Sequence, residues 1–203
     1  MNAWRTPERP AAVETEIQIA RLMRGLKKVV VLFTVQSGVD MQPAWDAISR
    51  SPSDWLWLVR IHRKMMTPTY EATVRSLISG SAAEVRVRAA TLSPLYALLS
   101  AVDVHVTAFS TCAVEALAFG VPTVTFGQNA SHAFGDLLES SAMCHALDGA
   151  EIVASIRRFR GFNPRDAKQL AEAHFQDPET CRTTLGALRL SLSGSQSEHR
   201  VER

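Results

Sequence analysis

Short apolar runs alternate with longer segments of helical spacing along this chain. Lys28 to Thr34, K-V-V-V-L-F-T, is a continuous apolar run with β-branched residues, which is typical of a strand buried on both faces of a parallel sheet. Glu84 to Arg88 alternates charged and apolar residues, so we expect this strand nearer an edge of the sheet. The remaining predicted strands are Asp54 to Ile61, Val102 to Thr107, Thr123 to Phe126 and Met143 to Leu147.

Helices are predicted between these strands and after the last of them. One follows Ser110, and another, from Ala150 to Phe159, is capped by Asp148. The others are Gln42 to Arg50, Thr69 to Ser79, Pro94 to Ser100 after a loop at Ala89 to Ser93, His132 to Leu138 and Pro164 to His174. Because strands alternate with helices throughout, the expected fold class is α/β, with a doubly wound, mostly parallel sheet of about six strands and helices on both faces.

The chain divides into three parts. We expect residues 1–27 to form an N-terminal arm and a helix from Val13 to Leu26, and residues 28–190 to form one α/β domain that ends with a helix from Pro178 to Leu190. Residues 191–203 are polar and rich in serine, so we expect a disordered tail. A length of 203 residues fits one such domain.

The stretch from Ser110 to Gly127 combines the strongest local signals. Ser110 and Thr111 suit a helix N-cap, because their hydroxyl oxygens can accept the helix's free N–H groups. Gly120 ends the helix and Pro122 prevents it from resuming. The predicted buried face consists of Val114, Leu117, Ala118 and Val121.

Polar residues follow three of the predicted strands and should meet at one edge, because the carboxyl ends of parallel strands lie together. The hydroxyls of Ser110 and Thr111 suit a diphosphate, whereas the Glu115 carboxylate suits the hydroxyls of a ribose. Gly38 would let the backbone approach a ligand closely. The residues concerned are Gln36, Ser37 and Gly38, then His62, Arg63 and Lys64, then Ser110 and Thr111.

Simpler interpretations stay open for several of these residues. Ser110 and Thr111 could serve the helix cap alone, and Glu115 could make an internal salt bridge. His62 could be structural. His105 lies within a predicted strand, so we expect it to be buried and hydrogen-bonded. A helix N-terminus can lower a thiol pKa, but no base near Cys112 favours a nucleophile.

Composition excludes several other classes of function. The net charge is +2 and the arginines are scattered, so no basic stripe indicates nucleic acid. Three cysteines lie far apart without metal-ligand spacing, which favours reduced thiols and a cytoplasmic location. No dinucleotide or P-loop motif, signal peptide or membrane-spanning run occurs. There is no D-x-D carboxylate cluster, and we expect neither a metal nor a cofactor.

The stretch from Lys28 to about Phe159 carries residues that match the sequence pattern of a known protein family. They are Asp103, Thr107, Ser110-Thr111, Glu115-Ala116, Phe119-Gly120, Pro122, Val124 and Phe126-Gly127. This pattern resembles the C-terminal, donor-binding domain of GT-B glycosyltransferases, and it is most similar to enzymes of bacterial surface and capsular polysaccharide synthesis. His62-Arg63 resembles part of an R-x-H-P-R element of those enzymes, although the proline is missing here.

The resemblance implies that the chain binds a nucleotide diphosphate-sugar as a substrate. It implies that Ser110 and Thr111 contact the diphosphate, that Glu115 holds the ribose, and that Leu92 lies in the loop that faces the base. The acceptor-binding domain that comes first in such enzymes has no counterpart before Lys28, so a separate acceptor-domain chain is a candidate partner. Contact with a membrane surface also stays open, and no catalytic residue is assigned.

Two alternatives remain. A relative of the sugar-nucleotide 2-epimerases would use the same donor motif. A non-catalytic binding or assembly subunit would dock on a separate acceptor-binding chain. The pattern leaves open the base, the sugar, the acceptor and the stereochemical outcome.

Overall fold

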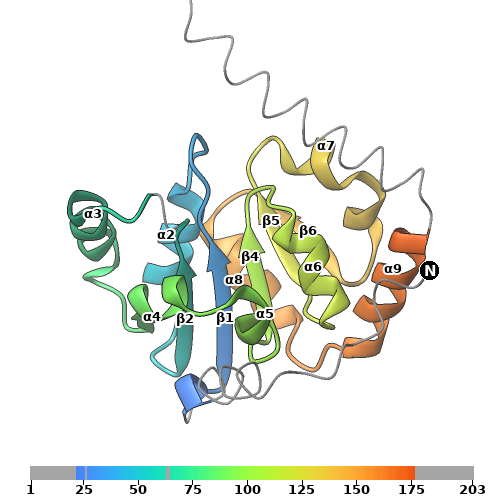
Figure 1. The fold of residues 1–203 in the computed structure, drawn as a ribbon, viewed down its shortest axis with the longest axis horizontal. Coiled ribbons are helices and arrows are strands. Elements are labelled where there is room, and N and C mark those ends of the chain that lie inside the picture. The colour runs from blue at the N-terminus through green and yellow to red at the C-terminus, as the bar shows by residue number, and fades with distance from the viewer. Residues whose placement is uncertain (1–21, 26, 63–64, 177–203) are drawn as a thin grey trace, which may run out of the picture.

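The computed structural model describes residues 22–25, 27–62 and 65–176 of the chain. Six strands alternate with helices along it (Figure 1). The strands are β1 (Val29–Thr34), β2 (Trp55–Arg60), β3 (Glu84–Arg86), β4 (Val104–Thr107), β5 (Thr123–Phe126) and β6 (Met143–Ala146). The helices are α2 (Gln42–Ser49), α3 (Pro68–Ile78), α4 (Arg88–Leu92), α5 (Leu95–Leu99), α6 (Cys112–Ala118), α7 (Ala130–Phe134), α8 (Gly149–Arg158) and α9 (Pro164–Gln176), with a 3₁₀ helix η2 (Gly135–Glu139).

All six strands form one parallel sheet in the order β3-β2-β1-β4-β5-β6. The chain builds outward from β1 to β3 and then returns to place β4 on the other side of β1. The order therefore reverses between β1 and β4, which is where open α/β sheets bind ligands beyond the carboxyl ends of the strands. The predicted α/β class is confirmed, and so is the edge position of β3.

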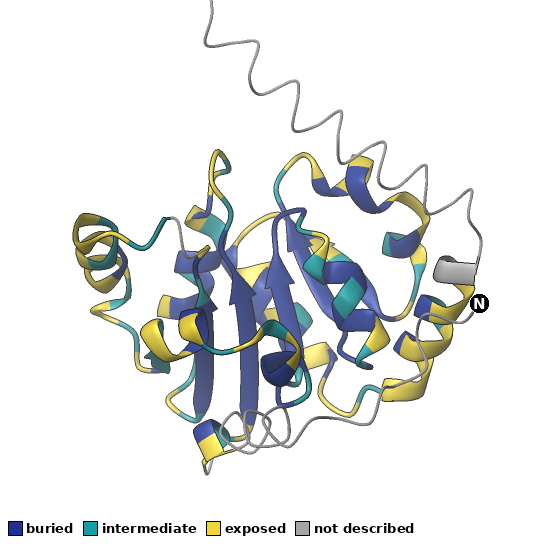
Figure 2. Ribbon diagram, in the orientation of Figure 1, coloured by how far each residue is buried: buried dark blue, intermediate teal, exposed yellow. Residues whose placement is uncertain are grey.

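Helices cover both faces of the sheet. In Figure 1, α5 and α6 lie in front of the sheet, and α2 and α8 lie behind it. Alternate residues of β1 serve the two faces: Val31 and Phe33 pack with α2 and α8, whereas Val30 and Leu32 pack with α5. The central strands are accordingly buried along their length (Figure 2), as the continuous apolar run of β1 predicts.

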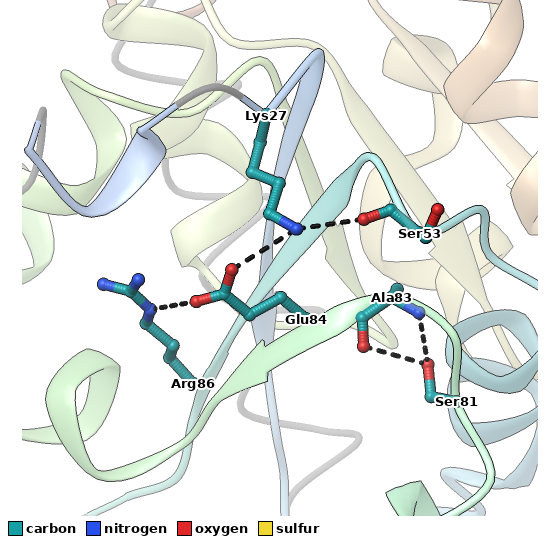
Figure 3. Close-up of polar contacts among 6 residues, drawn as sticks. All are labelled: Lys27, Ser53, Ser81, Ala83, Glu84 and Arg86. Carbon is teal, nitrogen blue, oxygen red and sulfur yellow. Dashed lines mark hydrogen bonds and ion pairs between the residues drawn. The ribbon is translucent and has the colours of Figure 1, made fainter.

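The edge strand β3 is held by charged groups (Figure 3). The Lys27 ammonium donates to the Ser53 carbonyl at 2.9 Å and lies 3.4 Å from Glu84 Oε2, while Arg86 Nε donates to Glu84 Oε1 at 2.6 Å. The Arg86 hydrogen bond is the main reason why the pKa of the Glu84 carboxyl lies below its usual value. Charges of this kind also discourage an edge strand from pairing with another chain.

The segment that precedes β1 is tied to the domain, although most of the predicted helix from Val13 to Leu26 lies outside the described residues. Residues 22–24 are helical, and Met23 is buried in the core. The Arg24 guanidinium donates to both carboxylate oxygens of Asp103 at 2.9 Å, and Asp103 Oδ2 also accepts the Val30 N–H at 2.8 Å. The predicted helix from Pro178 to Leu190 and the predicted tail at 191–203 also lie outside the described residues.

The structure corrects two local predictions. The sequence predicts a loop at residues 89–93, but Arg88–Leu92 form the short helix α4. The helical spacing predicts Ala118 on the buried face of α6, but it is exposed, whereas Ala113 and Ala116 are buried. The reason is that α6 packs against α9 as well as the sheet, so its buried face is turned toward Ala113 and Ala116.

Candidate functional site

Two loops meet where the strand order reverses. Thr34 and Thr107 are register partners at the ends of β1 and β4, so the loops that follow begin side by side. The side-chain oxygen of Gln36 accepts the backbone N–H of Phe109 at 2.9 Å. This hydrogen bond joins the loop of Ser37 and Gly38 to the loop that leads into Ser110.

The start of α6 is capped by one of the two predicted residues. Ser110 Oγ accepts the Cys112 N–H at 3.3 Å, and the Ser110 carbonyl accepts the Ala113 N–H at 2.9 Å. The prediction that Thr111 also caps the helix is wrong, because its side chain makes no capping hydrogen bond. Its backbone is already helical, with φ of −54°, whereas a capping side chain requires a more extended backbone.

Glu115 lies on α6 beside Tyr96 of α5. The Tyr96 hydroxyl donates to Glu115 Oε1 at 3.3 Å, and the Tyr96 ring stacks on Phe119 with centroids 5.4 Å apart. Glu115 is half-buried and makes no ion pair within the described part of the chain. The internal salt bridge that the sequence left open is therefore absent there, and the carboxylate is held by a phenol instead.

This contact has a measurable consequence. The charge of Glu115 is the main reason why the pKa of the Tyr96 phenol is raised above its usual value. Neutralising the carboxylate in Glu115→Gln should lower that pKa, because the negative charge that opposes phenolate formation is gone. Ultraviolet titration suits the measurement, since the chain has 2 tyrosines, and Tyr96→Phe assigns the shifted one.

Tyr70 provides the internal control, because burial is what raises its pKa. The Tyr70 transition should stay in place in Glu115→Gln. If both tyrosines shift together, or if neither does, the two residues are not coupled as described.

Arg60, at the end of β2, anchors the short helix α4, whose last residue is Leu92. Its guanidinium donates to the carbonyls of Ala90, at 3.0 Å, and Ser93. Leu92 itself is 51% exposed. The role of Arg60 escapes sequence reasoning, although a basic residue at the end of an apolar strand is a signal that could have found it.

The other predicted site residues lie at the same edge. His62 is exposed just beyond β2, and Arg63 lies outside the described residues. Ser37 and Gly38 are exposed after β1, and Gly38 has φ of +73° with open space where a side chain would begin. The structure thus brings the loops after β1, β2 and β4 to one edge, which is what the alternation of strands and helices predicts.

A buried polar layer lies between the sheet and α6. Thr34 Oγ1 and His105 Nε2 are 2.9 Å apart, and His105 Nδ1 and Thr123 Oγ1 are 3.3 Å apart. Thr123 in turn donates to the carbonyl of Ala113 on α6 at 3.5 Å. The prediction that His105 is buried and hydrogen-bonded is confirmed, and the layer ties the helix of Glu115 to three strands.

A cavity of about 340 Å³ adjoins the loop after β1. It is lined by Gln36, Ser37 and Gly38 on one side and by Trp45 and residues of α3 on the other. A cavity of about 250 Å³ lies at the opposite edge, between the starts of β1 and β4 and the start of α9, away from the polar strand ends.

Two other chemistries find little support at this edge. Burial is the main reason why the pKa of the Cys112 thiol is raised above its usual value, which disfavours the thiolate that a nucleophile needs. Across the described ranges, no group of three or more His, Cys, Asp or Glu residues could hold a metal ion. The helices within these ranges are also too short or too polar to cross a membrane.

No protein-family model and no curated protein matches the sequence. Several solved structures are similar in fold, and three of them are described here. The kitacinnamycin glycotransferase is 16% identical with a TM-score of 0.52, over 94% of this chain and 46% of that one. The UDP-GlcNAc 2-epimerase from Neisseria meningitidis, bound to UDP-GlcNAc, is 13% identical with a TM-score of 0.56, over 79% and 43%. The wall teichoic acid polymerase TagF is 10% identical with a TM-score of 0.53, over 92% and 48%.

These likenesses concern the fold. The chain spans less than half the length of each of the three proteins. Its six-stranded parallel sheet with helices on both faces is consistent with a Rossmann-like α/β half of a GT-B fold.

Proposed function

We propose that this chain is the nucleotide-sugar-binding domain of a glycosyltransferase that acts in surface polysaccharide biosynthesis. One observation carries the proposal. The hydrogen bond between Gln36 and Phe109 joins two loops where the strand order reverses, and these loops bear Ser37, Gly38 and Ser110. Parallel α/β sheets bind their ligands at such a point. The motif from Ser110 to Gly127 and the fold likeness support the same conclusion.

In this proposal the donor lies across the carboxyl edge of the sheet. Ser110, Thr111 and the backbone of Ser37 and Gly38 donate hydrogen bonds to the diphosphate, and Glu115 accepts hydrogen bonds from the ribose hydroxyls. Tyr96 holds the Glu115 carboxylate in place from the side of α5. Leu92 faces the base at the end of α4, the helix that Arg60 anchors, and His62 and Arg63 bind the phosphates.

The chemistry of such a site is the stabilisation of a leaving group. When the bond between the sugar and the diphosphate breaks, negative charge develops on the diphosphate oxygens, and donors placed there in advance lower the barrier. The acceptor and the residue that activates it would come from an acceptor-binding domain or from a separate chain. No residue described here is assigned as the catalytic base.

An epimerase-like function is a second candidate, because the Neisseria 2-epimerase has the same fold with a TM-score of 0.56. It would use the same donor site and yield a 2-epimer of the nucleotide sugar rather than a glycoside. A non-catalytic assembly subunit would bind the donor and turn over nothing. Product analysis, with and without candidate acceptor chains, separates these three.

Glu115→Gln should weaken the binding of a nucleoside diphosphate by at least about tenfold, because it removes the charge from hydrogen bonds worth about 1.5–3 kcal/mol. Calorimetric titration of the full chain with UDP, CDP and GDP measures the loss and identifies the base. The same substitution should weaken the binding of the free nucleoside to a similar degree, since the nucleoside and the nucleoside diphosphate both contain the ribose.

Glu172→Gln is the matched control, since Glu172 is exposed on α9 and the charge change is the same. Its affinity should equal that of the unmodified chain. If a folded chain binds none of the nucleotides, the donor-site proposal is wrong for the chain on its own. If Glu115→Gln binds as well as the control, the ribose is held elsewhere.

A further inference from the structure

Gln36 lies between the two loops of the candidate site and is half-buried. Its Oε1 atom accepts the Phe109 N–H at 2.9 Å and lies 3.3 Å from the Thr107 hydroxyl, which donates to it. Both donors belong to the far side of the point where the strand order reverses. The sequence pattern places Gln36 at a strand end but assigns it no role.

The Phe109 hydrogen bond fixes which way the amide of Gln36 is turned. A backbone N–H can only donate, so the Gln36 side chain must present its oxygen to Phe109. Its NH₂ group, with two N–H donors, is left pointing away from that contact. Across the described ranges the NH₂ group has no hydrogen-bond partner.

The surroundings of this NH₂ group suit a ligand that accepts hydrogen bonds. Ser37 and Gly38 follow Gln36 directly, and Ser110 follows Phe109, so neither stretch contributes a carboxylate. Phosphate oxygens have many acceptor sites and no donors of their own when ionised. Gln36 also lines the cavity of about 340 Å³ beside this loop, so a ligand can reach it.

We propose that Gln36 is a binding residue of this site, whose NH₂ group donates to an oxygen of the donor diphosphate while its oxygen holds the Phe109 loop. This inference rests on the proposed function and adds a contact to it. Gln36 then binds the phosphate part of the ligand, whereas Glu115 binds the ribose.

The test compares Gln36→Glu with Gln36→Leu by calorimetry, with UDP, uridine and inorganic pyrophosphate as the probes. Another base replaces uracil if the titration of the unmodified chain selects it. Gln36→Glu keeps an acceptor for Phe109 and replaces the NH₂ group by a negatively charged oxygen. Gln36→Glu should weaken the binding of UDP and of pyrophosphate by at least about tenfold, and it should leave the affinity for uridine within about twofold of that of the unmodified chain. Gln36→Leu should also weaken the binding of UDP and pyrophosphate. The control is Gln42→Glu, at an exposed glutamine at the start of α2, and it should leave both affinities unchanged.

The outcomes separate this inference from the proposed function. Undiminished UDP binding by a folded Gln36→Glu chain overturns the inference and leaves the donor site standing, and so does an equal loss of uridine and UDP. If the unmodified chain binds pyrophosphate but no nucleotide, the donor proposal fails, and the loss of pyrophosphate in Gln36→Glu still supports Gln36 as an anion ligand. If the unmodified chain binds none of the three probes, both the inference about Gln36 and the proposed function are overturned.

Discussion

Gly120→Ala is expected to lower the free energy of unfolding by about 2–5 kcal/mol. Two independent costs combine at this position. Gly120 has φ of +78°, a conformation that costs an L-residue about 1–2 kcal/mol. An added Cβ would also lie 2.8 Å from Pro164 Cβ and 2.9 Å from the Pro164 carbonyl oxygen, and overpacking of this kind costs about 1–3 kcal/mol.

The hydrogen bonds around Gly120 explain why its conformation cannot relax. The Gly120 N–H donates to the Leu117 carbonyl at 2.8 Å and the Val121 N–H to the Ala116 carbonyl at 3.0 Å. This pair is a Schellman motif, which ends α6 and requires the left-handed residue between its two donors. The close approach of Pro164 then sets the start of α9 against the end of α6, the helix that carries Glu115.

Gly161→Ala is the matched control for this prediction. Gly161 has φ of +83°, but nothing lies within 4 Å of the position of its Cβ. Gly161→Ala should therefore lower the free energy of unfolding by the conformational cost alone, about 1–2 kcal/mol. Urea unfolding of both variants measures the difference, and equal losses would mean that the contact with Pro164 costs nothing.

The sequence predicts the sheet well because each strand carries its own local signal. The continuous apolar run of β1 and the alternation in β3 predict a central and an edge position, and the structure has both. Gly120 and Pro122 correctly mark the end of α6. These features depend on neighbouring residues in the chain, so one sequence suffices to find them.

The features that the sequence misses depend on tertiary contacts. The short helix α4 has no capping side chain. The guanidinium that anchors it belongs to Arg60, which is distant in sequence at the end of strand β2. Thr111 has the right side chain for a cap but the wrong backbone conformation. For the candidate site, sequence places the strand ends at one edge, whereas the links from Gln36 to Phe109 and from Tyr96 to Glu115 require the fold.

The threonines of β4 and β5 also show that a local sequence pattern does not determine burial. Residues that alternate between polar and apolar along a strand usually indicate one face in water. Thr107, Thr123 and Thr125 are nevertheless fully buried. Each hydroxyl has a partner inside the fold: Thr123 contacts His105 and the Ala113 carbonyl of α6, Thr107 donates toward the Thr34 carbonyl, and Thr125 donates to the Cys144 carbonyl. Polar side chains are stable in a core when their hydrogen bonds are satisfied in this way.

The buried imidazole of His105 makes the fold sensitive to acid. Burial lowers its pKa from 6.5 to about 3, and its two hydrogen-bond partners are hydroxyls rather than carboxylates. Between these two values the unfolded chain binds a proton that the folded chain does not. The contribution of neutral His105 to stability is therefore complete above pH 6.5 and is lost progressively as the pH falls toward 3.

This linkage should reduce the free energy of unfolding by about 1.4 kcal/mol for each pH unit below 6.5, and thus by about 2 kcal/mol at pH 5. In His105→Gln this part of the pH dependence should disappear, because the amide does not titrate, although the variant starts from a lower stability at pH 7. His132→Gln, at an exposed position on α7, should keep the steep dependence of the unmodified chain. Urea unfolding at pH 7, 6 and 5 measures all three slopes. Parallel slopes in the unmodified chain and His105→Gln would mean that another group carries the acid sensitivity, and that the polar layer beneath α6 tolerates a charged imidazole.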